Sequence, residues 1–212
     1  MQCILVDGRQ EVAWNIFKQK GPRKGRNSRK DVEHFLIDAI ESFENCDYVE
    51  AIKRFQLIIK LYPDHPIAHL ILARAYIGLK DFPRAIVVLY DHLEIVPDSV
   101  EAMIYLGLAY FECNELELAQ ERFEQAMKLK ANSVLARENL VITKISAGRL
   151  EEAMADLLQL RKERPGDQNL VELVVLALGK MGKWEAAKQY LQQNDGSTTL
   201  DGALASIAAE PH

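Results

Sequence analysis

The sequence predicts an all-α protein built from tandem helix pairs, and three observations lead to this prediction. Alanine returns every 34 residues along most of the chain, at Ala51, Ala85, Ala119, Ala153 and Ala187. The apolar residues around these alanines follow a 3.6-residue helical period and not an alternation. Turn-forming residues interrupt the pattern twice in every 34 residues, at matching places. A period of this length is typical of architectures that stack one supersecondary unit on the next.

Each unit contains two helical patterns. The first is apolar along one helical face, as at Leu72, Tyr76 and Leu79 in the second unit. The second carries the recurring alanine and, four residues later, a bulky apolar residue. In chain order these bulky residues are Phe55, Leu89, Phe123, Leu157 and Leu191. The small side chain allows two helix backbones to approach, and the bulky one fills the space beside it. We therefore expect neighbouring pairs to stack around a continuous core.

Breaks in the pattern mark the helix ends. Between units they read Pro63-Asp64, Pro97-Asp98-Ser99, Asn132-Ser133 and Pro165-Gly166-Asp167. Proline cannot continue a helix, and the Asp or Ser that follows can accept hydrogen bonds from the free N–H groups of the next one. Shorter polar or glycine breaks separate the two helices within a unit. The predicted units are 32–65, 66–99, 100–133, 134–167 and 168–194.

The repeat resembles that of tetratricopeptide repeat (TPR) proteins. The third unit carries the closest match to the family pattern, with Met103, Leu106, Gly107, Tyr110, Ala119, Phe123 and Ala126. The resemblance covers about residues 31–194. It implies a TPR α-solenoid, which is a right-handed superhelix of antiparallel helix pairs, with the first helix of each pair facing a concave groove.

Two segments lie outside the repeats. Residues 1–30 form a leader, in which a short apolar helix at about 10–18 precedes a basic linker; the stretch from Lys18 to Lys30 holds seven basic residues and no acidic one. Residues 195–212 are expected to form a tail or a short capping helix, because Leu200, Leu204 and Ile207 share one helical face.

No motif in the sequence predicts an enzyme, a cofactor or a catalytic residue. Phosphate-binding loops, dinucleotide fingerprints, nucleophile elbows and zinc-protease motifs are all missing. His65 and His69 have a spacing that metal ligands sometimes use, but Pro66 places His65 just outside the following helix. We therefore expect packed histidines and no metal site.

The family geometry predicts which residues line the groove. They are Leu36, Ile37, Ile40, Ile67, Leu70, Ile71, Arg74, Ile104, Tyr105, Leu108, Phe111, Glu138, Asn139 and Ile142. This set is mostly apolar, which favours a groove that binds an apolar helix or peptide. The alternative is tighter helix packing that hides part of the same stripe. Leu36 and Ile40 occupy positions where the carboxylate clamp of chaperone-binding TPR domains has Lys and Asn, so a clamp of that type is disfavoured.

The sequence therefore predicts a non-enzymatic adaptor or scaffold whose partner is a protein or peptide segment. Alternatives within the family are a chaperone of a secreted apolar protein and an assembly scaffold similar to that of bacterial magnetosomes. Self-association through the leader is a further expectation. Binding of nucleic acid or an anionic membrane through the basic segment 18–30 is disfavoured, because that segment has no interleaved aromatic residues.

The overall composition is that of an ordinary globular protein. The chain has 212 residues, 26 Lys and Arg, 31 Asp and Glu, and a formal net charge of −5. It contains no run of 18 apolar residues, which a membrane-spanning helix requires. The apolar residues Ile4 to Val6 are too few for the core of a signal peptide. We expect a soluble cytoplasmic protein.

Overall fold

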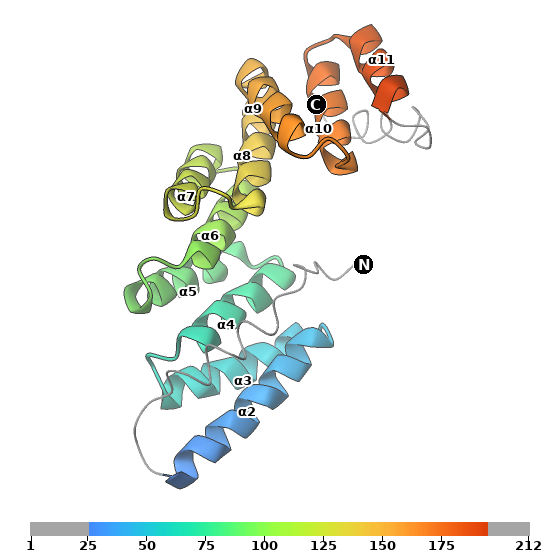
Figure 1. Ribbon diagram of the computed structural model, residues 1–212. Coiled ribbons are helices and arrows are strands. Elements are labelled where there is room, and N and C mark those ends of the chain that lie inside the picture. Colours follow the sequence, from blue (N-terminus) through green and yellow to red (C-terminus); the bar gives the residue numbers. More distant parts are fainter. Residues whose placement is uncertain (1–25, 195–212) are drawn as a thin grey trace. The chain divides into compact units, whose positions relative to one another are not determined.

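The computed structural model describes residues 26–194, and the secondary structure of this part of the chain is entirely helical (Figure 1). The helices form five consecutive pairs: α2 (Arg26–Glu44) with α3 (Tyr48–Leu61), α4 (Pro66–Gly78) with α5 (Phe82–Ile95), α6 (Val100–Glu112) with α7 (Leu116–Leu129), α8 (Val134–Ser146) with α9 (Leu150–Glu163), and α10 (Gln168–Lys180) with α11 (Trp184–Asn194). The predicted all-α architecture of tandem helix pairs is confirmed. The helices fall into two compact units that divide after Ala131. Unit 1 contains α2–α7 and unit 2 contains α8–α11.

The turn inside each pair shows the repeat most directly. Each turn contains one residue with a positive φ, between 59° and 73°. In chain order these residues are Cys46, Lys80, Asn114, Gly148 and Gly182. These residues are spaced 34 apart. The N–H of the residue that follows each of them donates to a carbonyl five residues earlier, as from Asp81 to Tyr76 at 2.8 Å. This is a Schellman-type C-cap, which ends a helix and reverses the chain within three residues.

Side chains at the breaks between pairs begin the next helix. Ser99, Ser133 and Asp167 accept from the backbone N–H of Ala102, Ala136 and Asn169, at 3.1–3.4 Å. These caps are among the residues that the sequence predicted.

At the first break the cap of α4 is His65, which the sequence had placed just outside the helix, and not Asp64. The Nδ1 atom of His65 accepts from Ala68 N at 3.2 Å. Pro66 occupies the first turn of the helix, so the residue directly before it becomes the N-cap.

The recurring alanines lie at the centre of the packing. Ala51, Ala85 and Ala119 in unit 1 have no exposed surface, and neither do Phe55, Leu89 and Phe123, which follow them by four residues. In unit 2 the same places hold Ala153 with Leu157 and Ala187 with Leu191, all buried. The small and bulky columns read from the sequence therefore form the core of each unit.

The helical structure begins earlier than we expected. Helix α2 starts at Arg26, inside the segment predicted to be a basic linker. The residues Asn27 to Lys30 contain neither proline nor glycine, so nothing in them interrupts a helix. The leader helix predicted at 10–18 and the tail or capping helix predicted at 195–212 lie outside the described residues.

Candidate partner-binding surface

The first helices of unit 1 carry most of the predicted groove residues. Helix α4 contacts both α2 and α6, so these three first helices are neighbours. Their second helices α3, α5 and α7 pack against them, as the contacts of α2 with α3 and of α6 with α7 show. The first helices α2, α4 and α6 of unit 1 therefore lie next to one another in chain order.

Three of the predicted groove residues are buried. The exposed fraction is 4% for Leu36, 8% for Ile71 and 7% for Ile104. Leu36 and Ile71 belong to the core cluster formed around Ala51 and Phe55. These three side chains support the surface from below and present little area to a partner, as the alternative of tighter packing anticipated.

The remaining predicted residues of unit 1 keep part of their surface in solvent. Ile37 is exposed and the others are half-buried. Together with the half-buried Phe43 on α2, we call this set the first-helix face: Ile37, Ile40, Phe43, Ile67, Leu70, Arg74, Tyr105, Leu108 and Phe111. Arg74 is the one charged residue in the set.

Arg74 connects the three helices at this face. Its guanidinium carbon lies 4.8 Å from the centroid of the Phe43 ring on α2 and 5.6 Å from that of the Tyr105 ring on α6. Both distances are within the range of cation–π attraction. The three side chains therefore lie together on one face of unit 1, although they are far apart in the sequence.

The phenol of Tyr105 stays protonated at neutral pH. Burial raises its pKa, the charge of Arg74 acts in the opposite direction, and Glu101 raises the pKa further. Tyr105 is thus a neutral aromatic residue with a hydroxyl that can donate a hydrogen bond.

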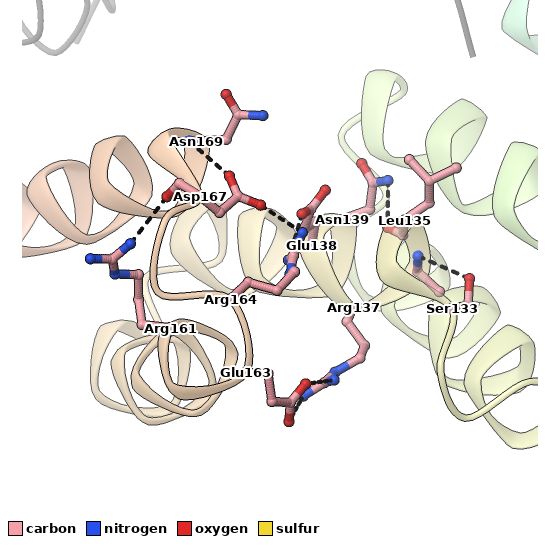
Figure 2. A network of polar contacts seen from close by, with 11 residues as sticks. Ser133, Leu135, Arg137, Glu138, Asn139, Arg161, Glu163, Arg164, Asp167 and Asn169 are labelled. Carbon is pink, nitrogen blue, oxygen red and sulfur yellow. Dashed lines mark hydrogen bonds and ion pairs between the residues drawn. The ribbon is translucent and has the colours of Figure 1, made fainter. Parts of the chain in front are cut away.

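The predicted groove residues of unit 2 lie on α8, and two of them have polar partners within that unit (Figure 2). The Oε1 atom of Glu138 accepts from Arg164 at 2.7 Å, and the Asn139 amide donates to the Leu135 carbonyl at 2.8 Å. Ile142 is half-buried. Because the side chains of Glu138 and Asn139 are already hydrogen-bonded within unit 2, they are less available to bind a partner.

Sequence reasoning missed Arg164. Its guanidinium binds Glu138 on α8 and, at 2.7 Å, Asp167 at the start of α10, so it joins three helices at one point (Figure 2). The separation of 26 positions between Glu138 and Arg164 does not correspond to a contact within one helix. Only the unit length of 34 residues, combined with knowledge of which helices touch, could have indicated this pair.

The histidines at the start of α4 are packed. The exposed fraction is 8% for His65 and 6% for His69, and His69 Nε2 lies 2.7 Å from the Pro63 carbonyl oxygen. Among the residues that the structure describes, no three His, Cys, Asp or Glu side chains gather in a way that could hold a metal ion. None of the described helices has both the length and the apolar character needed to cross a bilayer.

Comparison with protein families agrees with the architecture. The family described as "Tetratricopeptide repeat" matches residues 42–90, which span the turn and second helix of the first pair and most of the second pair. None of the curated proteins matches the chain in sequence.

Several solved structures are similar in fold. The crystal structure of MamA protein superposes with a TM-score of 0.68 at 20% identity, covering 85% of this chain and 96% of MamA. A MamA RS-1 double mutant gives 0.70 at 13% identity, with coverage of 84% and 97%. The first TPR of Spaghetti (RPAP3), bound to an HSP90 peptide, gives 0.54 at 22% identity, with coverage of 56% and 94%. The 34-residue helix pairs, the family match over residues 42–90 and these structural relatives show that the chain has the fold of tetratricopeptide repeat proteins.

Proposed function

We propose that this chain is a non-enzymatic adaptor or scaffold, and that it binds a helix or peptide segment of a partner protein on the first-helix face of unit 1. The observation that carries the proposal is the set of half-buried apolar side chains contributed by three neighbouring helices. Scattered exposed apolar residues are ordinary, but a contiguous set from several elements is typical of an interaction surface. An apolar helix face placed there would remove these side chains from water.

The chemistry of this face supports binding more than catalysis. Its ionisable groups are the guanidinium of Arg74 and the phenol of Tyr105. A guanidinium stays charged, and the pKa of Tyr105 is raised. Neither group acts as a base or nucleophile near neutral pH, and we assign no cofactor to the face.

A displayed library of random peptides of about 16 residues, long enough for four helical turns, tests the proposal. We expect intact protein to enrich amphipathic apolar peptides. Leu108→Glu should abolish this binding, because it places a charge within the apolar contact. Val87→Glu is the matched control: Val87 is 60% exposed on the second helix α5 and lies outside the first-helix face. Circular dichroism should stay helical for both variants. Peptides that bind Leu108→Glu as well as the intact chain would place the site elsewhere.

The leader is a second candidate occupant, from the same molecule or from a neighbouring copy. Burial of its apolar residues around Trp14 is favourable for the same reason as burial of an apolar partner helix. In a Trp184→Phe background, a docked leader would show blue-shifted Trp14 emission that a soluble quencher cannot reach. Emission like that of free tryptophan would exclude docking. Removal of residues 1–30 also tests whether the basic segment contributes to binding.

A further inference from the structure

Arg74 carries a charge that no other described residue neutralises. The residue is half-buried, and its guanidinium lies against the rings of Phe43 and Tyr105. Within residues 34–194, whose side chains are described, the guanidinium makes no ion pair and donates no hydrogen bond. Holding a cation partly out of water without an anion costs free energy. A group of this kind is therefore typical of a ligand-binding site.

Other arginines of the chain are paired. Arg54 binds Glu50 at 2.9 Å, Arg137 binds Glu163 at 2.5 Å, and Arg164 binds Glu138. Arg84 is the most informative comparison, because it also lies over an aromatic ring, that of Tyr76 at 4.9 Å. The Arg84 guanidinium nevertheless binds the carboxylate of Asp81. Contact with an aromatic ring therefore does not replace an anionic partner in this fold.

The two rings leave the hydrogen-bonding capacity of Arg74 intact. A cation–π contact uses the charge of the guanidinium but none of its five N–H donors. The rings also restrict the side chain from two sides, so a ligand does not have to immobilise it alone. Leu70 lies one helical turn before Arg74 on α4 and is half-buried.

We propose that Arg74 binds the carboxylate of an Asp or Glu side chain within the apolar partner segment. This inference rests on the proposed function and adds to it the one charged contact that fixes the register of the partner. A single guanidinium matches a single carboxylate with two parallel hydrogen bonds. A phosphate group carries nearly two charges and is usually bound by a cluster of arginines. Arg74 has no second cation beside it on the first-helix face.

The same displayed library tests this inference through the sequences it yields. Peptides selected by intact protein should carry one Asp or Glu at a fixed place among apolar residues. For each of these peptides, changing that acid to its amide should weaken binding about 10-fold to 100-fold, the value of one or two charge-assisted hydrogen bonds. C-terminally amidated versions should bind unchanged, which distinguishes a side-chain carboxylate from the carboxyl terminus.

Variants of the protein provide the second half of the test. Arg74→Gln should bind the acidic peptide and its amide equally weakly, whereas Arg84→Gln should keep the full preference for the acid. Arg74→Glu should select peptides with Lys or Arg at the fixed place. If intact protein enriches apolar peptides without an acidic preference, and Leu108→Glu abolishes that binding, the proposed function holds and the role of Arg74 is wrong. If no peptide is enriched, or if Leu108→Glu changes nothing, both proposals are wrong.

Discussion

A Cβ atom added to Gly107 would lie 2.5 Å from Cε1 of Phe123, closer than any real contact of that kind. Both residues belong to the pair α6 and α7, and Phe123 is fully buried. In the other pairs the position of Gly107 is held by Ala39, Ala73, Val141 or Val175. The position of Phe123 is Leu in three of those four pairs, and in these a side chain replaces the hydrogen of glycine. The absence of a side chain at 107 therefore makes room for the large ring.

Gly107→Ala should destabilise the protein although alanine is the better helix former. The gain in helix propensity is about 1 kcal/mol, whereas overpacking a filled core costs roughly 1–3 kcal/mol. We expect a net loss of about 1 kcal/mol in the free energy of unfolding, measured by urea denaturation.

The double variant Gly107→Ala, Phe123→Leu separates the two contributions. With the ring shortened, the added methyl group should stabilise relative to Phe123→Leu alone, because only the helix propensity remains. If Gly107→Ala were equally harmful in both backgrounds, the contact with Phe123 would not be the cause.

The left-handed turn of the fourth pair predicts a second effect. Gly148 has a φ of 73°, and an added Cβ would meet nothing within 4 Å. Gly148→Ala should therefore cost about 1 kcal/mol through backbone conformation alone. Gly166→Ala is the matched control, because its site is equally open and its φ is not in the left-handed region. Thermal melting of both variants checks the prediction, and equal melting temperatures would contradict it.

Much of the fold could be predicted because the repeat supplies the same information five times. A single break such as Lys80-Asp81 is weak evidence, but the turns at residues 46, 80, 114, 148 and 182 share one register. The core columns at Ala119 and Phe123 were recognised in the same way. The start of α2 was not, since a linker and an extra helical turn at 26–30 have the same polar composition.

The candidate site could be predicted only in part. Leu36 and Ile37 are adjacent in sequence and both apolar, yet one is buried and the other exposed. Leu36 belongs to the core cluster of Ala51 and Phe55, whereas Ile37, about 100° further around the helix, does not. A list that counts both as groove residues misses this difference. The position of Arg74 was visible in the sequence, but its contact with Phe43 and Tyr105 depends on three helices coming together.

The contacts of Arg164 in unit 2 lead to a third prediction. Arg164→Met leaves the carboxylates of Glu138 and Asp167 without their shared cation, and both are partly buried. We expect a loss of about 1–2 kcal/mol in the free energy of unfolding at low salt. Arg137→Met removes the pair with the more exposed Glu163 and should cost clearly less. A larger loss for Arg137→Met would contradict this ranking. Chemical denaturation of the two variants in the same buffer measures it.

Buried histidines predict how stability depends on pH. His92 is 3% exposed, its Nδ1 lies 3.0 Å from the Pro66 carbonyl, and its Nε2 lies 3.0 Å from Ser99 Oγ. Burial lowers the pKa of His92, and the nearby His69 lowers it further, while the Pro66 carbonyl and Glu101 act in the opposite direction. Burial also lowers the pKa of His65. In the folded state both side chains therefore resist protonation more than they do in the unfolded chain.

The direction of the pH effect follows from this difference. Above pH ~6.5 a histidine is largely neutral in both states, so these two groups cost the fold nothing there. As the pH falls below that value, the unfolded chain takes up protons first, and the free energy of unfolding decreases toward the lowered folded-state pKa.

Urea denaturation should accordingly show lower stability at pH ~5.5 than at pH ~7.5. His92→Gln should reduce this dependence. Carboxylates with lowered pKa, such as Glu50 and Asp81, titrate below this range and do not interfere. An unchanged pH dependence in His92→Gln would show that His92 is not one of its sources.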